Sequence, residues 1–305
     1  LGERVANQEV SKADLLLVVG SALSPIDTCS ENPELIDPGR QKIIQVDVDP
    51  RNAGWIFPLE VGLVGDAKVV LRQLLEALEP RETDRPPYIE HPRVRELQAE
   101  KEVDFFVSPE CHEDRQPILR ERLVYELSEA LPPEAIIAGD AGNNRICMTR
   151  FFKTKAAGTY FGTFGIAGMS WSLPAALTAK LLHPDRPCVS VSSDGFAMQN
   201  HVLATALQYN APVIFVVLND YRLSMVHEAH GERTFNTDYP PTNWAAMAEV
   251  YRCRGIRVET VADVQSALSK ALKSDLPTVI DVVIDRDAKL FTKLLHPWGL
   301  SLIHI

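Results

Sequence analysis

The feature that most constrains the fold is a regular alternation of short apolar runs with amphipathic segments in the second half of the chain. Residues 134–142, 187–195, 211–220 and 276–285 are predicted as buried strands with turns or polar residues at their ends. Helical patterns lie among them, for example at 173–183, 200–210 and 261–274. Continuously apolar strands separated by helices are typical of a parallel sheet covered on both faces. The sequence therefore predicts a doubly wound α/β domain.

The first half repeats this alternation on a smaller scale. Residues 13–21 and 42–50 read as strands, and residues 67–80 read as an amphipathic helix. We expect residues 1–80 to form a partial α/β middle domain. Residues 81–116, which begin in a charged and proline-rich stretch, are predicted as a linker, 117–286 as the second domain and 287–305 as a C-terminal tail.

Composition excludes several classes of function. The chain of 305 residues has a formal net charge of −10, which argues against a broad nucleic-acid or membrane-surface role. No apolar run reaches the roughly 18 residues that a membrane-spanning helix needs. The 5 cysteines are scattered and form no Cys-x-x-Cys pair, so we expect reduced thiols in a cytoplasmic protein.

Acidic residues follow two of the predicted strands. Asp194-Gly195 ends one strand, and Asn219-Asp220 ends the next. If these strands are neighbours, both carboxylates face the crevice beyond the carboxyl ends of the sheet, where ligands bind in such folds. Two carboxylates suit Mg²⁺ bound to a diphosphate. An equally good interpretation is that Asp194 caps a helix and Asp220 is a turn residue.

Several ordered motifs resemble those of thiamine diphosphate (ThDP) enzymes. The stretch from "SSDGF" to "VVLND" resembles their diphosphate-binding motif, and "GDAGNN" and "GIAGMSWSLPAALTAK" resemble two further segments. "NDYRLSMV" resembles acetolactate synthases, while "ADLLLVVGS", "IIQVDVDP" and "VGDAKVVLRQL" resemble the middle domain. The similarity covers roughly residues 5–285. It implies a diphosphate-binding domain preceded by part of a middle domain.

The resemblance also implies roles for individual residues. Asp194 and Asp220 would bind Mg²⁺ through their side chains and Arg222 through its backbone carbonyl. Met169, the catalytic candidate, would hold the cofactor in a bent conformation, and Ala167 would offer its carbonyl to the aminopyrimidine. The complete implied cofactor-binding set is Gly142, Asn143, Asn144, Ala167, Gly168, Met169, Asp194, Gly195, Phe196, Asp220, Arg222, Leu223, Ser224, Met225 and Val226.

The implied activity is that of a ThDP- and Mg²⁺-dependent lyase or transferase acting on a 2-oxo acid, with acetolactate synthase-like carboligation of pyruvate as the first candidate. Another 2-oxo acid decarboxylase or lyase of the family, and a catalytically silent nucleotide- or diphosphate-binding homologue, are the alternatives. The family's N-terminal pyrimidine-binding domain has no counterpart in the sequence. We therefore expect a fragment or one partner of a split enzyme, acting in a homodimer or homotetramer.

Some positions depart from the family pattern. Ser193 replaces the first glycine of the motif, and only one glycine follows Asp194, so the loop is shorter than in acetolactate synthases. "GSALSPIDT" lacks the arginine of FAD-binding members, which disfavours FAD, although Asp47 and Asp49 offer a nucleotide ribose two acids. An NAD-dependent dehydrogenase using these acids is a further alternative. "HEAH" lacks the spacing of a zinc helix.

Overall fold

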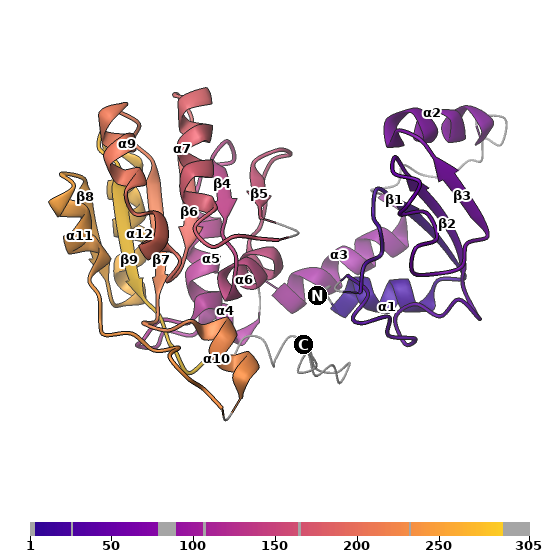
Figure 1. The fold of residues 1–305 in the computed structure, drawn as a ribbon, viewed down its shortest axis with the longest axis horizontal. Coiled ribbons are helices and arrows are strands. Elements are labelled where there is room, and N and C mark those ends of the chain that lie inside the picture. The colour runs from indigo at the N-terminus through magenta and orange to yellow at the C-terminus, as the bar shows by residue number, and fades with distance from the viewer. Residues whose placement is uncertain are drawn as a thin grey trace. The chain divides into compact units, whose positions relative to one another are not determined.

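The computed structural model describes residues 4–25, 27–78, 90–105, 108–163, 166–231 and 233–288. The chain divides into two compact units, residues 1–104 and 105–305. Each unit is built around its own parallel sheet (Figure 1). Most of the tail predicted at 287–305 lies outside the described residues.

The first unit carries a three-stranded parallel sheet in the order β1-β2-β3. Its elements are α1 (Arg4–Lys12), β1 (Leu15–Val19), β2 (Lys42–Asp47), β3 (Val61–Val64), α2 (Ala67–Leu78) and α3 (Pro92–Phe105). The central strand β2 supplies Ile43, which packs with Leu35, Ile36 and Phe57 in a small core. Both predicted strands and the helix of this half are therefore present.

Part of the segment 81–116, which the sequence predicts as a linker, is helical. Helix α3 occupies Pro92–Phe105 and α4 occupies Pro109–His112, while residues 81–89 lie outside the described part. Apolar residues in α3 are few and are not gathered on one face, so the pattern that identifies amphipathic helices is absent there. Charge and proline content were therefore a poor guide to this segment.

The second unit contains a six-stranded sheet and the helices that cover it. After α4, its first elements are α5 (Arg120–Ala130), β4 (Ile136–Gly139), α6 (Asn143–Phe151), β5 (Tyr160–Gly162), α7 (Ser172–Leu182), β6 (Cys188–Ser192) and α8 (Phe196–Gln199). They continue with α9 (Val202–Gln208), β7 (Ile214–Asn219), α10 (Ser224–His230), α11 (Trp244–Val250), β8 (Arg254–Val258), α12 (Val261–Leu272) and β9 (Thr278–Val283).

All six strands are parallel and lie in the order β5-β4-β6-β7-β9-β8. From β4 the chain moves outward to β5, then returns to the other side of β4 to form β6 and β7. The direction of winding therefore reverses between β4 and β6. This reversal is the topological switch point, where the crevice beyond the strand ends opens in doubly wound sheets.

Helices cover both faces of this sheet, as predicted (Figure 1). Along β7, Ile214, Val216 and Leu218 pack into the core with α5, α6 and α12. Phe215 and Val217 of the same strand pack into the opposite core with α7, α9 and α11. Because successive strand side chains point to opposite faces, a strand buried on both sides must be apolar throughout. This requirement explains the uninterrupted apolar runs.

No helix in the described part of the chain is long and apolar enough to cross a membrane. All five cysteines are described and none forms a disulfide.

Candidate functional site

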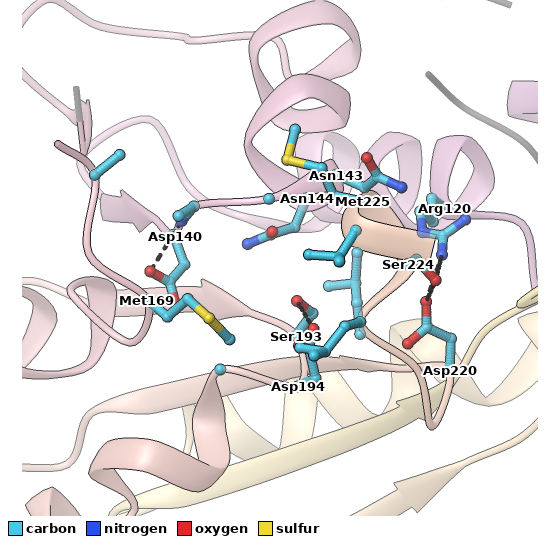
Figure 2. A pocket seen from close by; sticks show the side chains of 17 residues that line it. Arg120, Asp140, Asn143, Asn144, Met169, Ser193, Asp194, Asp220, Ser224 and Met225 are labelled. Carbon is cyan, nitrogen blue, oxygen red and sulfur yellow. Dashed lines mark hydrogen bonds and ion pairs between the residues drawn. The ribbon is translucent and has the colours of Figure 1, made fainter. Parts of the chain in front are cut away.

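A cavity of about 220 Å³ lies at the switch point of the second sheet (Figure 2). It is lined by the residues that follow β4, β6 and β7 and by the first turns of α6 and α10. Arg120 of α5 and the loop before α7 also contribute to its lining. The lining residues are Arg120, Asp140, Ala141, Gly142, Asn143, Asn144, Ala167, Met169, Ser193, Asp194, Gly195, Leu218, Asp220, Leu223, Ser224, Met225 and Val226.

Most of the residues singled out from the sequence meet in this cavity. Gly168, Phe196 and Arg222 do not line it. Phe196 is fully buried, and its ring packs edge-on against Phe215 and Trp244, so its side chain belongs to the core. The Arg222 side chain bonds to Asp238, with 2.6 Å between Nε and Oδ1. The roles expected for the backbones of these residues remain predictions.

Asp194 follows β6 and is held by two hydroxyl groups. Ser193 Oγ donates to Asp194 Oδ1 at 2.7 Å, and Tyr239 Oη donates to Oδ2 at 3.0 Å. Burial raises the pKa of the Asp194 carboxyl, and the nearby Asp220 charge raises it further. The ionised form of Asp194 is therefore destabilised in this cavity, and a nearby positive charge would stabilise it. Tyr239 lies 45 residues away in sequence and was not singled out.

Asp220 follows β7 and forms a buried ion pair. Arg120 Nη2 lies 2.5 Å from Asp220 Oδ2, and the two side chains are both 3% exposed. Ser224 Oγ donates to the same oxygen at 2.5 Å, and the backbone N–H of Arg222 donates to Oδ1 at 3.2 Å. Figure 2 shows Arg120 and Ser224 together on one side of the cavity, above Asp220. Arg120 belongs to α5, and no local signal connects it with Asp220.

Asp140 follows β4 and is the third acid of the cavity. Its Oδ1 accepts from the backbone of Ala141 at 2.9 Å, and its Oδ2 from the backbone of Ser170 at 2.9 Å. Burial raises the pKa of the Asp140 carboxyl to about 6, since desolvation outweighs these donors and the Asp194 charge adds to it. The sequence placed this acid in a turn but gave it no role.

The loop 167–170 approaches Gly195 closely. A Cβ atom at Gly195 would lie 3.2 Å from the Ser170 nitrogen and 3.5 Å from the Met169 Cβ, so only glycine fits without displacement. Ala167 and Ser170 adopt φ of 49° and 69°, a left-handed conformation that non-glycine residues rarely take. Such strain is concentrated at functional sites. The Met169 side chain between them is 40% exposed and reaches into the cavity (Figure 2).

Asn143 and Asn144 begin α6 after Gly142, whose φ of 89° permits the tight turn from β4. Asn143 Nδ2 donates to Glu228 Oε1 at 2.7 Å, and Asn144 Nδ2 donates to the Val191 carbonyl at 3.2 Å. Both amide oxygens are buried and accept no hydrogen bond from the described residues. Buried acceptors without a donor are costly, which indicates that a bound group or water supplies one.

The donor set of the cavity suits a hard cation with an anionic ligand. Asp140, Asp194 and Asp220 outnumber the single guanidinium of Arg120 among its lining residues, so its formal charge is negative. Mg²⁺ typically takes one or two carboxylates and completes its shell with water and phosphate oxygens. In the described part of the chain, no three His, Cys, Asp or Glu side chains gather as a ligand set, so a zinc-type cage is not seen.

The acids of the first unit are engaged locally. Asp47 Oδ1 accepts from the backbone of Asp49 at 2.8 Å, and Asp49 pairs with Arg51 at 2.6 Å. These contacts account for the acids at the end of β2 without a nucleotide. The sequence-based expectation that FAD is disfavoured remains a prediction, and NAD binding remains an alternative.

Family comparisons match both units. The family described as the C-terminal TPP binding domain of thiamine pyrophosphate enzymes matches residues 140–282. The family described as the central domain of thiamine pyrophosphate enzymes matches residues 1–74. The two matches follow one another in the order that the motifs predict.

Curated relatives align along almost the whole chain. A probable acetolactate synthase large subunit of Methanocaldococcus jannaschii is 31% identical over 93% of this chain and 48% of its own length. A putative thiamine pyrophosphate-containing protein, YdaP, of Bacillus subtilis is 30% identical over 97% and 50%, respectively. The acetolactate synthase large subunit of Corynebacterium glutamicum is 29% identical over 92% and 46%. The chain thus spans about half the length of the curated relatives it matches.

Proposed function

Since this chain belongs to the acetolactate synthase-like family of thiamine diphosphate enzymes, we propose that its cavity binds the diphosphate of ThDP through Mg²⁺ and that the protein acts on a 2-oxo acid. Carboligation of pyruvate, as in acetolactate synthesis, is the first candidate reaction. The names of the relatives support this choice of reaction.

The observation that carries the proposal is the convergence of Asp194 and Asp220 at the carboxyl ends of the neighbouring strands β6 and β7. Gly195 lets the backbone of the turn after β6 approach the loop 167–170 closely, and it lines the cavity without adding a side chain to it. A diphosphate needs this combination of close backbone approach and a cation held by oxygen ligands.

Three groups of this chain are proposed to hold Mg²⁺. They are the carboxylates of Asp194 and Asp220 and the backbone carbonyl of Arg222. The two backbone hydrogen bonds of the β-bridge between Arg222 and Asp238 are accepted by the carbonyls of Tyr221 and Thr237. The bridge therefore leaves the carbonyl of Arg222 available to a metal ion. Phosphate oxygens and water would complete the shell of the ion.

The remaining lining residues are proposed to position the cofactor and exclude water. ThDP, when bound, supplies a carbon nucleophile and an electron sink for the breakdown of a 2-oxo acid. Met169 would support the cofactor from the side of the strained loop, and the carbonyl of Ala167 would orient its aminopyrimidine. Leu223, Met225 and Val226 give the cavity an apolar wall, which favours a dry reaction centre.

The proposal includes partners. The family resemblance implies a pyrimidine-binding domain that carries the activating glutamate and a site completed in a homodimer or homotetramer. Because this chain spans about half of its curated relatives, the activity is proposed for the protein that contains both kinds of domain.

Calorimetric titration with ThDP, with and without Mg²⁺, tests the cavity. We expect Mg²⁺-dependent binding that Asp194→Ala abolishes and Asp185→Ala, at an exposed loop position, leaves intact. Binding that ignores both Mg²⁺ and Asp194 would contradict the proposal. Inorganic pyrophosphate with Mg²⁺ is a second probe, because it needs only the diphosphate part of the site.

Formation of acetolactate from pyruvate tests the reaction itself. In the assembled protein, product should appear only when ThDP and Mg²⁺ are both present. Failure to consume pyruvate, together with turnover of another 2-oxo acid, would move the assignment to a different member of the family. Failure with every simple 2-oxo acid would refute the proposed activity.

A further inference from the structure

We infer that Arg120 is a built-in counter-cation, which holds Asp220 until a divalent cation displaces it and thereby sets the metal affinity of the cavity. The inference rests on the proposed Mg²⁺ site and concerns its regulation. It starts from the two acids of that site, because their partners differ in kind.

The partners of Asp194 are neutral, whereas the main partner of Asp220 carries a positive charge. The hydroxyls of Ser193 and Tyr239 leave the negative charge of Asp194 in place. The guanidinium of Arg120 neutralises the charge of Asp220 and occupies its Oδ2 from 2.5 Å. For an incoming divalent cation, Asp194 therefore offers an uncompensated negative charge, whereas Asp220 is already paired with a cation.

The position of Arg120 is held by several contacts. Its Nη1 donates to the carbonyl of Ala288 at 2.9 Å, and its Nη2 also lies 3.2 Å from Ser224 Oγ. The residue is 2% exposed, so water contributes little to the solvation of its charge. Because the guanidinium is planar and its donors are fixed in a fork, pairing with Asp220 costs it little side-chain entropy. Asp220 is thus paired by a cation that is already preorganised in the cavity wall.

Charge repulsion sets the guanidinium and the metal in competition for Asp220. Two positive charges about 4 Å apart repel strongly at the effective dielectric constant of a protein site. A metal ion bound to both acids must either push Arg120 away from Asp220 or bind Asp220 only through Oδ1, which already accepts from the Arg222 backbone. Both routes lower the metal affinity, because the first breaks the contacts of Arg120 and the second leaves two positive charges close together.

Substitution of Arg120 by methionine tests this competition directly. Arg120→Met removes the charge and keeps an unbranched, flexible side chain that extends about as far as the Nε of arginine. We expect Mn²⁺, used alone as the probe, to bind about tenfold tighter, which corresponds to about 1.4 kcal/mol. The loss of the free Mn²⁺ signal in electron paramagnetic resonance measures the affinity without any cofactor or turnover.

Arg122→Met is the matched control. Arg122 lies on the same helix and is also paired, with Glu126 at 2.9 Å, but it does not line the cavity. Its substitution should leave Mn²⁺ affinity unchanged. Equal gains in both variants would indicate a general charge effect and would overturn the inference.

Arg120→Lys keeps the test decisive if the methionine variant does not fold. Lysine retains the charge but lacks the fork that bonds Asp220, Ser224 and Ala288 together, so an intermediate gain in Mn²⁺ affinity is expected. Unchanged or weaker affinity in a folded Arg120 variant would overturn the inference. If wild-type binding of Mn²⁺ depends on Asp194 while Arg120 variants bind equally well, only the inference fails. Absence of Mn²⁺ binding in every variant would overturn it together with the proposed metal site.

Discussion

Acidification is expected to stabilise the fold through Asp140. The pKa of this carboxyl rises from 3.8 to about 6, chiefly because the group is buried at the end of β4. In the folded protein Asp140 therefore keeps its proton up to about pH 6, whereas in the unfolded chain it releases the proton near pH 3.8. Between these values the folded state binds more protons, so the contribution of Asp140 to stability falls as the pH rises.

The magnitude follows from the size of the shift. A rise of about two pKa units corresponds to about 3 kcal/mol, at about 1.4 kcal/mol per unit. This stability is fully present below pH 3.8 and is lost as the pH rises through about 6. Because the neighbouring Asp194 charge contributes to the shift, the value is an upper estimate for Asp140 alone.

Urea unfolding of the wild type and Asp140→Asn at a series of pH values isolates this effect. Asparagine keeps the size of the side chain and removes the titration. It also replaces one acceptor, which adds an offset that does not depend on pH. From about pH 7 to about pH 4.5, the free energy of unfolding of the wild type should rise relative to that of the variant by up to about 2 kcal/mol, because the remainder of the effect lies between about pH 4.5 and pH 3.8.

Parallel pH curves for the two proteins would refute the reasoning, because they would mean that Asp140 titrates alike in the folded and unfolded states.

The same unfolding series can be repeated with Mn²⁺ and pyrophosphate added. A cation bound at Asp194 favours ionised Asp140, so the difference between the two proteins should then shrink.

Three further substitutions separate stability from binding. Gly195→Ala places a Cβ 3.2 Å from the Ser170 nitrogen, and urea unfolding should show a loss of about 1–2 kcal/mol; an unchanged midpoint would contradict the close approach. Tyr239→Phe removes the hydroxyl that donates to Asp194, so the free energy of unfolding should fall by about 1 kcal/mol, and a neutral result would argue against this bond. Met169→Ala truncates a side chain that is 40% exposed, so stability should change by less than about 1 kcal/mol while calorimetry shows weaker ThDP binding; unchanged binding would remove Met169 from the proposed site.

Periodicity and chain order were enough to predict β4, β6, β7 and β9 of the second sheet, whereas the three-residue strand β5 was not predicted. Strands such as β7 are continuously apolar up to their polar end because both faces of the sheet are covered. This pattern can be recognised from consecutive residues alone. Helix α3 was missed because its apolar residues follow no helical period and its neighbours are rich in charge and proline. Pattern reasoning therefore succeeded where burial was regular.

Some residues of the candidate site could be predicted from local sequence patterns, and others could not. Asp194 and Asp220 were found because each follows a predicted strand, and parallel strands end at one edge of a sheet. Arg120, which lies 100 positions before Asp220, and Tyr239 were not found. Their own segments carry no pattern that distinguishes a partner of a buried acid from an ordinary surface arginine or tyrosine.

By itself, the sequence determined the α/β class of the chain and the strand ends at which acids gather, because these depend on residues close together along the backbone. Only the tertiary structure decided the partners of those acids: two neutral hydroxyls at Asp194 and a buried guanidinium at Asp220. The physical reason is that the charge balance of a buried carboxylate depends on every group packed around it, and packing brings those groups from helices and loops far away in the chain.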